Sequence, residues 1–156
     1  MKNLKILWAI IIILSILSGF LVYKFVAGSV VKSDDNRIAI SLDKKYRNYI
    51  LDEMRQFLIS VQTIGLAINE NKIDKVVSLA TKAGMAAEKN TPAGVFRALP
   101  LSMKTLGFGT RKKFDDVAKS AKNGATQTEL RKKLNNLLGN CIACHSTYKL
   151  VESNKK

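Results

Sequence analysis

The pentapeptide CIACH at residues 141–145 constrains this chain more than any other feature. Cys-x-x-Cys-His is the signature of covalent c-type haem attachment. On a helix the two thiols lie one turn apart, where they can add to the two vinyl groups at one haem edge. The histidine that follows can place an imidazole nitrogen beneath the iron as an axial ligand. The motif therefore predicts one covalent haem c, held by Cys141 and Cys144, with His145 as the proximal ligand.

Two other uses of a Cys-x-x-Cys pair remain open. A redox dithiol normally opens a helix beside a βαβ pattern, and no segment of this sequence reads as β. A structural zinc site needs a complete tetrahedral ligand set, and the chain has no second Cys-x-x-Cys pair and no second histidine. Cys141 and Cys144 are the only cysteines, so the motif favours haem attachment over a dithiol or zinc.

The chain is strongly basic, with 26 lysine and arginine residues against 12 acidic ones and a formal charge of +14. Residues 1–33 contain four lysines and no acids, so the remainder keeps 22 basic and 12 acidic residues, a charge near +10. Such a surface favours redox partner proteins with acidic surfaces, or anionic lipid headgroups. A purely solubilising role explains the charge as well. Nucleic acid is not a predicted partner, because the lysines are scattered without interleaved aromatic residues.

An apolar run near the start of the chain predicts a transmembrane helix. Lys2 and Lys5 precede 18 uncharged residues, from Ile6 to Tyr23. The core of a signal peptide usually has about 7–15 residues, whereas a spanning helix needs about 17 or more. We therefore expect residues 1–31 to form an anchor with its N-terminus in the cytoplasm and the following chain exported.

Small residues at 26–29 also suit a signal peptidase, and cleavage near residue 28 would leave a soluble periplasmic protein. Both alternatives predict export, and bacteria attach c-type haem outside the cytoplasm. We expect the domain to face the periplasm, or the outer face, of a bacterial inner membrane. Residues 32–41 are predicted to be a polar tether, and residues 42–152 the folded domain.

Four helices are predicted within this domain. The first starts near Leu42, and its apolar stripe steps by three or four residues. This stripe contains Tyr46, Ile50, Met54, Phe57, Val61, Ile64 and Ile68. A weaker second helix covers about residues 73–88 and has small residues on its inner face. Glycines and prolines predict a loop over residues 90–110 with a helical turn at 101–106, followed by a third helix at 110–123.

Thr126 and Glu129 form a capping-box pair that predicts the start of the fourth helix. Its apolar stripe comprises Leu130, Leu134, Leu137, Cys141, Cys144 and Tyr148. Both cysteines therefore occupy core positions, and we expect the haem to lie inside a packed set of helices.

Four helices with Cys-x-x-Cys-His on the last turns of the fourth resemble the cytochrome c′ family and its low-spin relatives. The resemblance covers about residues 42–150 and includes the segments EMRQFLISVQTIGLAI, LPLSMKTLGFGTRKKFDDVA and CIACHSTYK. It implies an all-α fold, an antiparallel four-helix bundle with one covalent haem, preceded here by a single transmembrane helix. Members of the family often form homodimers, so the resemblance also implies this state.

The distal side of the iron decides between two functions. Met54 aligns with the methionine ligand of the low-spin relatives. At about 1.5 Å per residue, Met54 and His145 lie roughly 12 and 9 Å from the same end of two neighbouring helices, which suits facing positions across a haem. The alternative is a methionine that only fills space in the core. Met85 and Met103 are less well placed.

Met/His ligation gives a low-spin iron with a raised potential, suited to single-electron transfer. Without Met54 as ligand, the iron would be five-coordinate and bind nitric oxide or carbon monoxide, as many cytochromes c′ do. Nothing resembles a set of catalytic acids, bases or nucleophiles, so we do not expect an enzyme.

Two basic residues are candidates for charges at the haem edge. Lys149 lies one turn after His145, where the family usually has an arginine. Arg55, beside Met54, can reach a haem propionate. A solvated surface charge explains each of them equally well.

Overall fold

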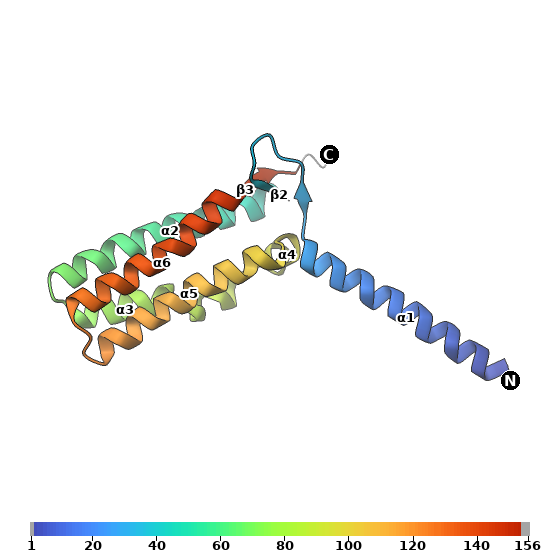
Figure 1. The fold of residues 1–156 in the computed structure, drawn as a ribbon, viewed down its shortest axis with the longest axis horizontal. Coiled ribbons are helices and arrows are strands. Elements are labelled where there is room, and N and C mark those ends of the chain that lie inside the picture. Colours follow the sequence, from blue (N-terminus) through green and yellow to red (C-terminus); the bar gives the residue numbers. More distant parts are fainter. Residues whose placement is uncertain (1, 154–156) are drawn as a thin grey trace.

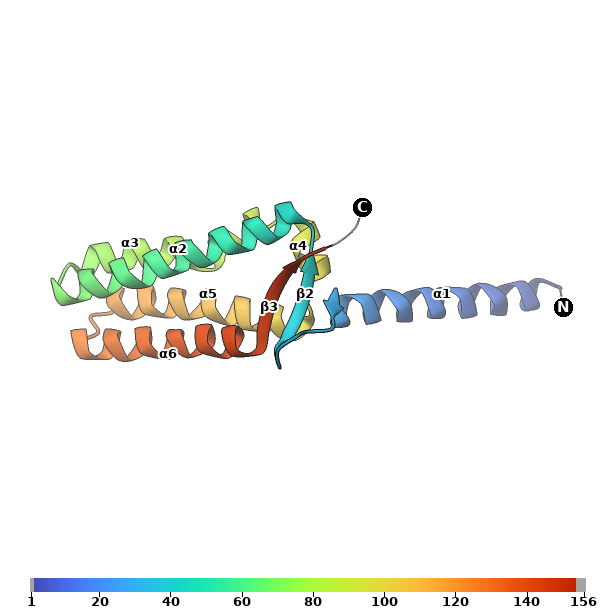
Figure 2. The same ribbon diagram turned by 90° about the horizontal axis from the view of Figure 1, so that it is seen from above.

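The computed structural model describes residues 2–153; Met1, the first residue of the predicted anchor, and residues 154–156 lie outside this range. The described chain is mostly helical, with six α-helices and a small three-stranded sheet (Figure 1). Helix α1 (Lys2–Ala27) projects away from a body that the other elements form (Figures 1 and 2). The predicted helical character is confirmed, but the small sheet means that the fold is not all-α.

Helix α1 is long and apolar enough to cross a membrane, and its candidate span Leu4–Ala27 is not buried in the rest of the protein. At about 1.5 Å per residue it measures about 39 Å, compared with about 30 Å for a bilayer core. A signal sequence shares these properties, so this helix fits either a membrane anchor or a signal sequence.

The body contains four long helices that lie side by side: α2 (Lys44–Asn69), α3 (Ile73–Ala83), α5 (Leu101–Lys122) and α6 (Gln127–Thr147) (Figures 1 and 2). Short connections join α2 to α3 and α5 to α6, so each of these pairs is antiparallel. The apolar stripes of all four helices meet in one core, whose fully buried side chains include Ile64, Ile68, Val76, Phe114, Val117, Leu130 and Leu137.

The predicted start of α6 is confirmed by its cap. The Thr126 hydroxyl accepts a hydrogen bond from the Glu129 backbone N–H at 3.3 Å. In return, the Glu129 carboxylate accepts one from the Thr126 N–H at 2.8 Å. These two bonds satisfy two donors that the first turn of a helix otherwise leaves free. The Thr126 N–H and the Thr126 hydroxyl both donate to the Glu129 carboxylate, and they lower the pKa of this carboxyl from its ordinary value of 4.5.

We expect Thr126→Ala to destabilise the protein by about 1 kcal/mol, because it removes the side-chain acceptor of this cap. Urea unfolding in detergent, followed by helical circular dichroism, measures the change. The contribution of ionised Glu129 is present above pH 4.5 and is lost as the pH falls through its lowered pKa. The difference between the two proteins should therefore become smaller in acid, where the Thr126 hydroxyl no longer bonds an ionised carboxylate. Thr105→Ala is the control, because this exposed hydroxyl bonds only within α5. Equal losses from both substitutions would contradict the prediction.

The predicted second helix is shorter than expected. Helix α3 ends at Ala83, and a 3-10 helix, η1 (Met85–Asn90), follows it. Asp115 on α5 causes the break, because its carboxylate accepts a hydrogen bond from the Met85 N–H at 3.1 Å. A Cβ atom on Gly84 would lie 1.8 Å from an oxygen of Asp115, so only glycine permits this approach.

The predicted loop over residues 90–110 is wrong. Residues Ala93–Ala98 form helix α4, and α5 already starts at Leu101. Pro100 directly precedes α5, where its missing N–H sacrifices no helical hydrogen bond. Gly107 and Gly109 remain inside the helix, although each costs about 1 kcal/mol relative to alanine. Tertiary packing therefore outweighs the helix-breaking tendency of these residues.

The expectation that no segment is β is also wrong. Strand β2 (Ile38–Leu42) pairs antiparallel with β1 (Val30–Val31) and parallel with β3 (Tyr148–Glu152). Ala39, Ile40 and Leu42 are buried in this sheet, so part of the predicted polar tether 32–41 is a core strand. Its partner β3 directly follows α6 in the sequence, so the sheet lies at the end of the body where the CIACH motif is found (Figure 2).

Candidate functional site

The hydrophobic core is divided into two clusters, and a cavity of about 510 Å³ borders both. Phe57 and Cys141 pack against the first cluster, which fills the space between the four long helices. Met54 and Cys144 pack against the second cluster, which includes the sheet. All four residues line the cavity. Protein interiors rarely hold voids larger than a water molecule, and ligand pockets typically measure about 300–1,000 Å³. The cavity between the two clusters is therefore a candidate binding site.

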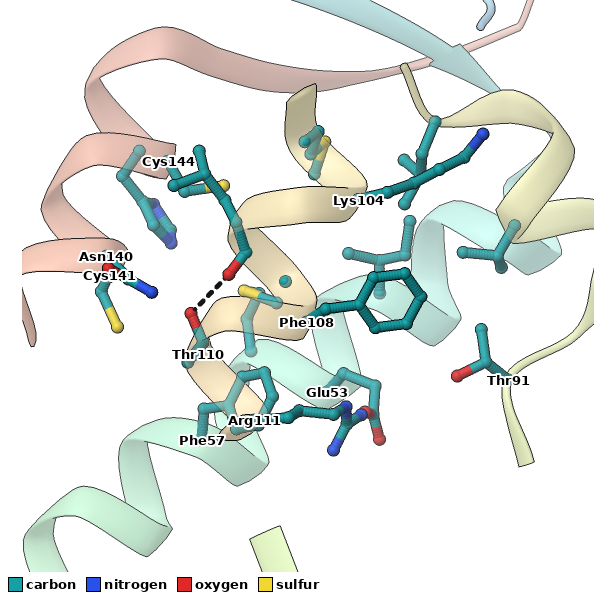
Figure 3. Close-up of a pocket in the computed structure, with 18 of the residues that line it drawn as sticks. Glu53, Phe57, Thr91, Lys104, Phe108, Thr110, Arg111, Asn140, Cys141 and Cys144 are labelled. Carbon is teal, nitrogen blue, oxygen red and sulfur yellow. Dashed lines mark hydrogen bonds and ion pairs between the residues drawn. The ribbon is translucent and has the colours of Figure 1, made fainter. Parts of the chain in front are cut away.

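Helix α6 supplies the predicted attachment residues. It continues to Thr147, so the CIACH motif lies on its last turns, as predicted. Cys141 and Cys144 are half-buried free thiols, and both extend from α6 at the cavity wall (Figure 3). His145 is more exposed and lines the same cavity. The two thiols and the imidazole thus share one cavity, which is what covalent attachment and proximal ligation of a haem require.

The surroundings of the thiols differ from those of a reactive dithiol. Burial raises the pKa of both cysteines, and the neighbouring Cys141 further raises that of Cys144. Redox dithiols usually have at least one lowered pKa, which provides a thiolate. Among residues 2–153 the structure contains no group of three or more His, Cys, Asp or Glu side chains that is arranged to hold a metal ion.

Helix α2 brings Met54 and Arg55 to the same cavity. Met54 is half-buried, between the cavity and the second cluster. Arg55 is exposed, and its guanidinium pairs with Asp52 at 3.1 Å. The structure therefore brings Met54 to one cavity with His145, although the two residues are far apart in the sequence. Ligation by Met54 stays a prediction, as does a contact between Arg55 and a propionate.

Lys149 does not line this cavity. It lies on β3 with a side chain that is 17% exposed, and its ammonium group forms ion pairs with Asp34 and Asp35. These pairs attach the segment before β2 to the sheet. Of the other two methionines considered, Met103 lines the cavity and Met85 does not.

An ion cluster with Arg111 at its centre was not predicted from the sequence. Arg111 on α5 lines the cavity, its side chain is only 6% exposed, and it pairs with Glu53 and Glu88. Its guanidinium also lies 4.9 Å from the centroid of the Phe57 ring (Figure 3). The sequence did contain one sign that Arg111 is buried. Arg111 lies three residues before the apolar Phe114, and residues three apart share a helix face. A charged residue on an apolar stripe needs a buried partner.

Lys104 is the second missed residue. It lines the cavity, is only 4% exposed, and donates a hydrogen bond at 2.9 Å to the carbonyl oxygen of Phe25 near the end of α1. Its ammonium lies 3.8 Å from the centroid of the Phe25 ring, and burial lowers its pKa. No local pattern predicts a partner on α1. This contact shows that the cavity lies at the end of the body from which α1 emerges.

The remaining cavity wall is mainly apolar and aromatic. It includes Leu58 from α2, and Phe108 from α5 (Figure 3). Two thiols one helical turn apart, an imidazole and a thioether are suited to hold a haem and its iron. No protein-family model, curated protein or solved structure matches the chain. The resemblance to cytochrome c′ therefore rests on the residues themselves and stays a prediction.

Proposed function

We propose that this protein is a membrane-anchored, monohaem c-type cytochrome with a cytochrome c′-like, antiparallel four-helix bundle, and that it transfers single electrons. The observation that carries the proposal is the cavity shared by Cys141, Cys144, His145 and Met54. In this proposal the cysteines bind the haem covalently, His145 is the proximal ligand and Met54 the distal ligand. When bound, the haem supplies a one-electron couple, whose potential methionine ligation raises.

The surrounding residues support this role in two ways. Phe57 and Phe108 give the cavity an apolar wall, which limits contact with water and favours the less charged, reduced iron. The two candidate axial ligands lie on different helices, α2 and α6, that pack against the same core clusters. A packed core keeps the ligand geometry constant, so little rearrangement accompanies a change of oxidation state.

The proposed location follows from α1 and from the charge of the body. Anchored by α1, the domain faces the periplasm, or the outer face, of a bacterial inner membrane, where c-type haem is attached. Its charge near +10 favours redox partner proteins with acidic surfaces. The family resemblance also suggests a homodimer. The role is electron transfer, without catalysis on a substrate.

The alternative function is gas binding by a five-coordinate haem. The apolar side chains beside Met54 support it, because an apolar distal wall suits an uncharged diatomic ligand. In that case Met54 is a wall residue and the iron keeps one free position. The two functions differ in whether carbon monoxide binds to the reduced native protein.

We expect the reduced native protein to show a low-spin spectrum that carbon monoxide does not alter. Met54→Ala removes the proposed distal thioether, so this variant should become five-coordinate and bind one carbon monoxide per haem. Visible absorption spectra of the reduced full-length proteins, with and without carbon monoxide, measure both effects.

Two other methionines serve as controls. Met85 lies outside the cavity, and Met103 provides a second thioether in the cavity wall. The variants Met85→Ala and Met103→Leu should therefore both retain the native spectrum. Rapid carbon monoxide binding by the native protein would refute electron transfer through Met/His-ligated iron and support the gas-binding alternative. A spectral change in Met103→Leu instead of Met54→Ala would assign the distal ligand to Met103.

A further inference from the structure

A second hollow, of about 580 Å³, lies where α1 joins the body. Helix α1 contributes Leu21, Lys24 and Phe25 to its wall, and α4 contributes Arg97 and Ala98. We call it the junction groove. It is separate from the cavity that carries the cysteines, and the proposed electron transfer does not use it.

The position of α1 beside α4 is fixed by backbone contacts. The Ser29 N–H donates a hydrogen bond to the Ala98 carbonyl at 2.7 Å, and the Ser29 carbonyl accepts one from the Ser41 N–H at 2.8 Å. Gly28 has φ +66°, and a Cβ atom there would lie 2.5 Å from the Pro100 nitrogen, so glycine is required. These contacts make residues 28 and 29 part of the fold. Cleavage near residue 28 would remove one wall of the groove.

The lining of the junction groove combines apolar and basic side chains. Leu21 and Phe25 lie near the end of the apolar helix, which is the depth of the headgroup region if α1 spans a bilayer. Lys24 and Arg97 are exposed and form no ion pair with any residue in the range 2–153. Asp43 also lines the groove and accepts a hydrogen bond from the Ser153 hydroxyl at 3.2 Å.

We propose that the junction groove binds an anionic phospholipid, whose phosphate lies between Lys24 and Arg97 and whose acyl chain follows Leu21 and Phe25. Lysine and arginine are the usual partners of phosphate, and each basic residue near an anionic membrane surface strengthens its attraction. The inference rests on the membrane anchoring in the proposed function, and not on the haem. A lipid in this groove holds α4 at the membrane surface and therefore orients the nearby cavity.

The test is native mass spectrometry of the full-length, delipidated protein in detergent, with phosphatidylglycerol or phosphatidylcholine added. We expect the anionic lipid to bind about tenfold more tightly than the zwitterionic one. The double variant Lys24→Gln, Arg97→Gln should lose this preference. The control Lys132→Gln, Lys133→Gln removes the same charge near the start of α6, at the opposite end of the body, and should keep the preference.

Equal binding of both lipids by the wild type would overturn the proposal, as would an unchanged preference in the Lys24/Arg97 variant. Inorganic phosphate is the third probe: if it binds as tightly as the lipid, the groove is a phosphate site and not a lipid site. The intact mass of the purified chain shows whether α1 is retained, and a mature chain starting near residue 29 would refute both the anchor and this inference. Haem staining of the same samples tests the cytochrome assignment separately.

Discussion

The double variant Cys141→Ser, Cys144→Ser should lose all covalently bound haem. A thiol can form a thioether bond with a haem vinyl group, whereas the serine hydroxyl that replaces it does not react in this way. Haem staining after denaturing electrophoresis measures the effect, because only covalently attached haem stays with the unfolded chain. Each single variant keeps one thiol, so each should retain a weaker signal.

Ile142→Ser is the matched control for this prediction. Ile142 lies between the two cysteines, and its side chain is 69% exposed, so the substitution changes the motif region without removing a thiol. It should retain full staining. If the native protein itself does not stain, the haem assignment is wrong and the dithiol and zinc alternatives return. If the double variant stains like the wild type, attachment does not use these cysteines.

Arg111→Met should destabilise the protein by about 3 kcal/mol. The substitution keeps an unbranched apolar side chain but removes the charge, so Glu53 and Glu88 lose their common partner at the cavity wall. Removing one partner of a buried ion pair typically costs about 3–5 kcal/mol, and the partial exposure of both carboxylates places this case at the low end. Urea unfolding of the full-length protein in detergent, followed by circular dichroism, measures the loss.

Neutralising the two carboxylates separates the electrostatic effect from lost packing. Glu53→Gln and Glu88→Gln, added to Arg111→Met, should restore part of the stability, because they remove the uncompensated charges. Arg55→Met is the control, since this exposed arginine pairs with Asp52 only at the surface and should change stability by less than about 0.5 kcal/mol. No recovery in the triple variant would show that Arg111 acts through packing alone.

The helices with strong apolar periodicity were predicted well. The apolar stripe of α2 ends at Ile68, one residue before the helix itself ends at Asn69. The Thr126–Glu129 pair marks the start of α6. Both signals are local, because a helix forms its hydrogen bonds within a few residues and its caps lie next to it in the sequence. Local rules therefore located these two helices.

The prediction failed where distant residues decide the local structure. Helix α3 ends where the Asp115 carboxylate on α5 accepts a hydrogen bond from the Met85 N–H. Helix α5 continues through Gly107 and Gly109 because its buried residues Phe114 and Val117 pack into the core with α3 and α6. Strand β2 forms because β3, at the other end of the domain, pairs with it. None of these partners lies within the window of a periodicity argument, so each effect needed the tertiary structure.

The sequence by itself determined the chemistry that this protein can offer. The CIACH motif and the apolar length of α1 are both properties of consecutive residues, so they can be identified without the tertiary structure. Only the tertiary structure decided what surrounds that chemistry. It brings Met54 to the cavity of the cysteines, places Arg111 and Lys104 in its wall, and engages Lys149 in ion pairs elsewhere. The physical reason is that a cavity is made by side chains from different helices, whose proximity depends on how the whole chain packs.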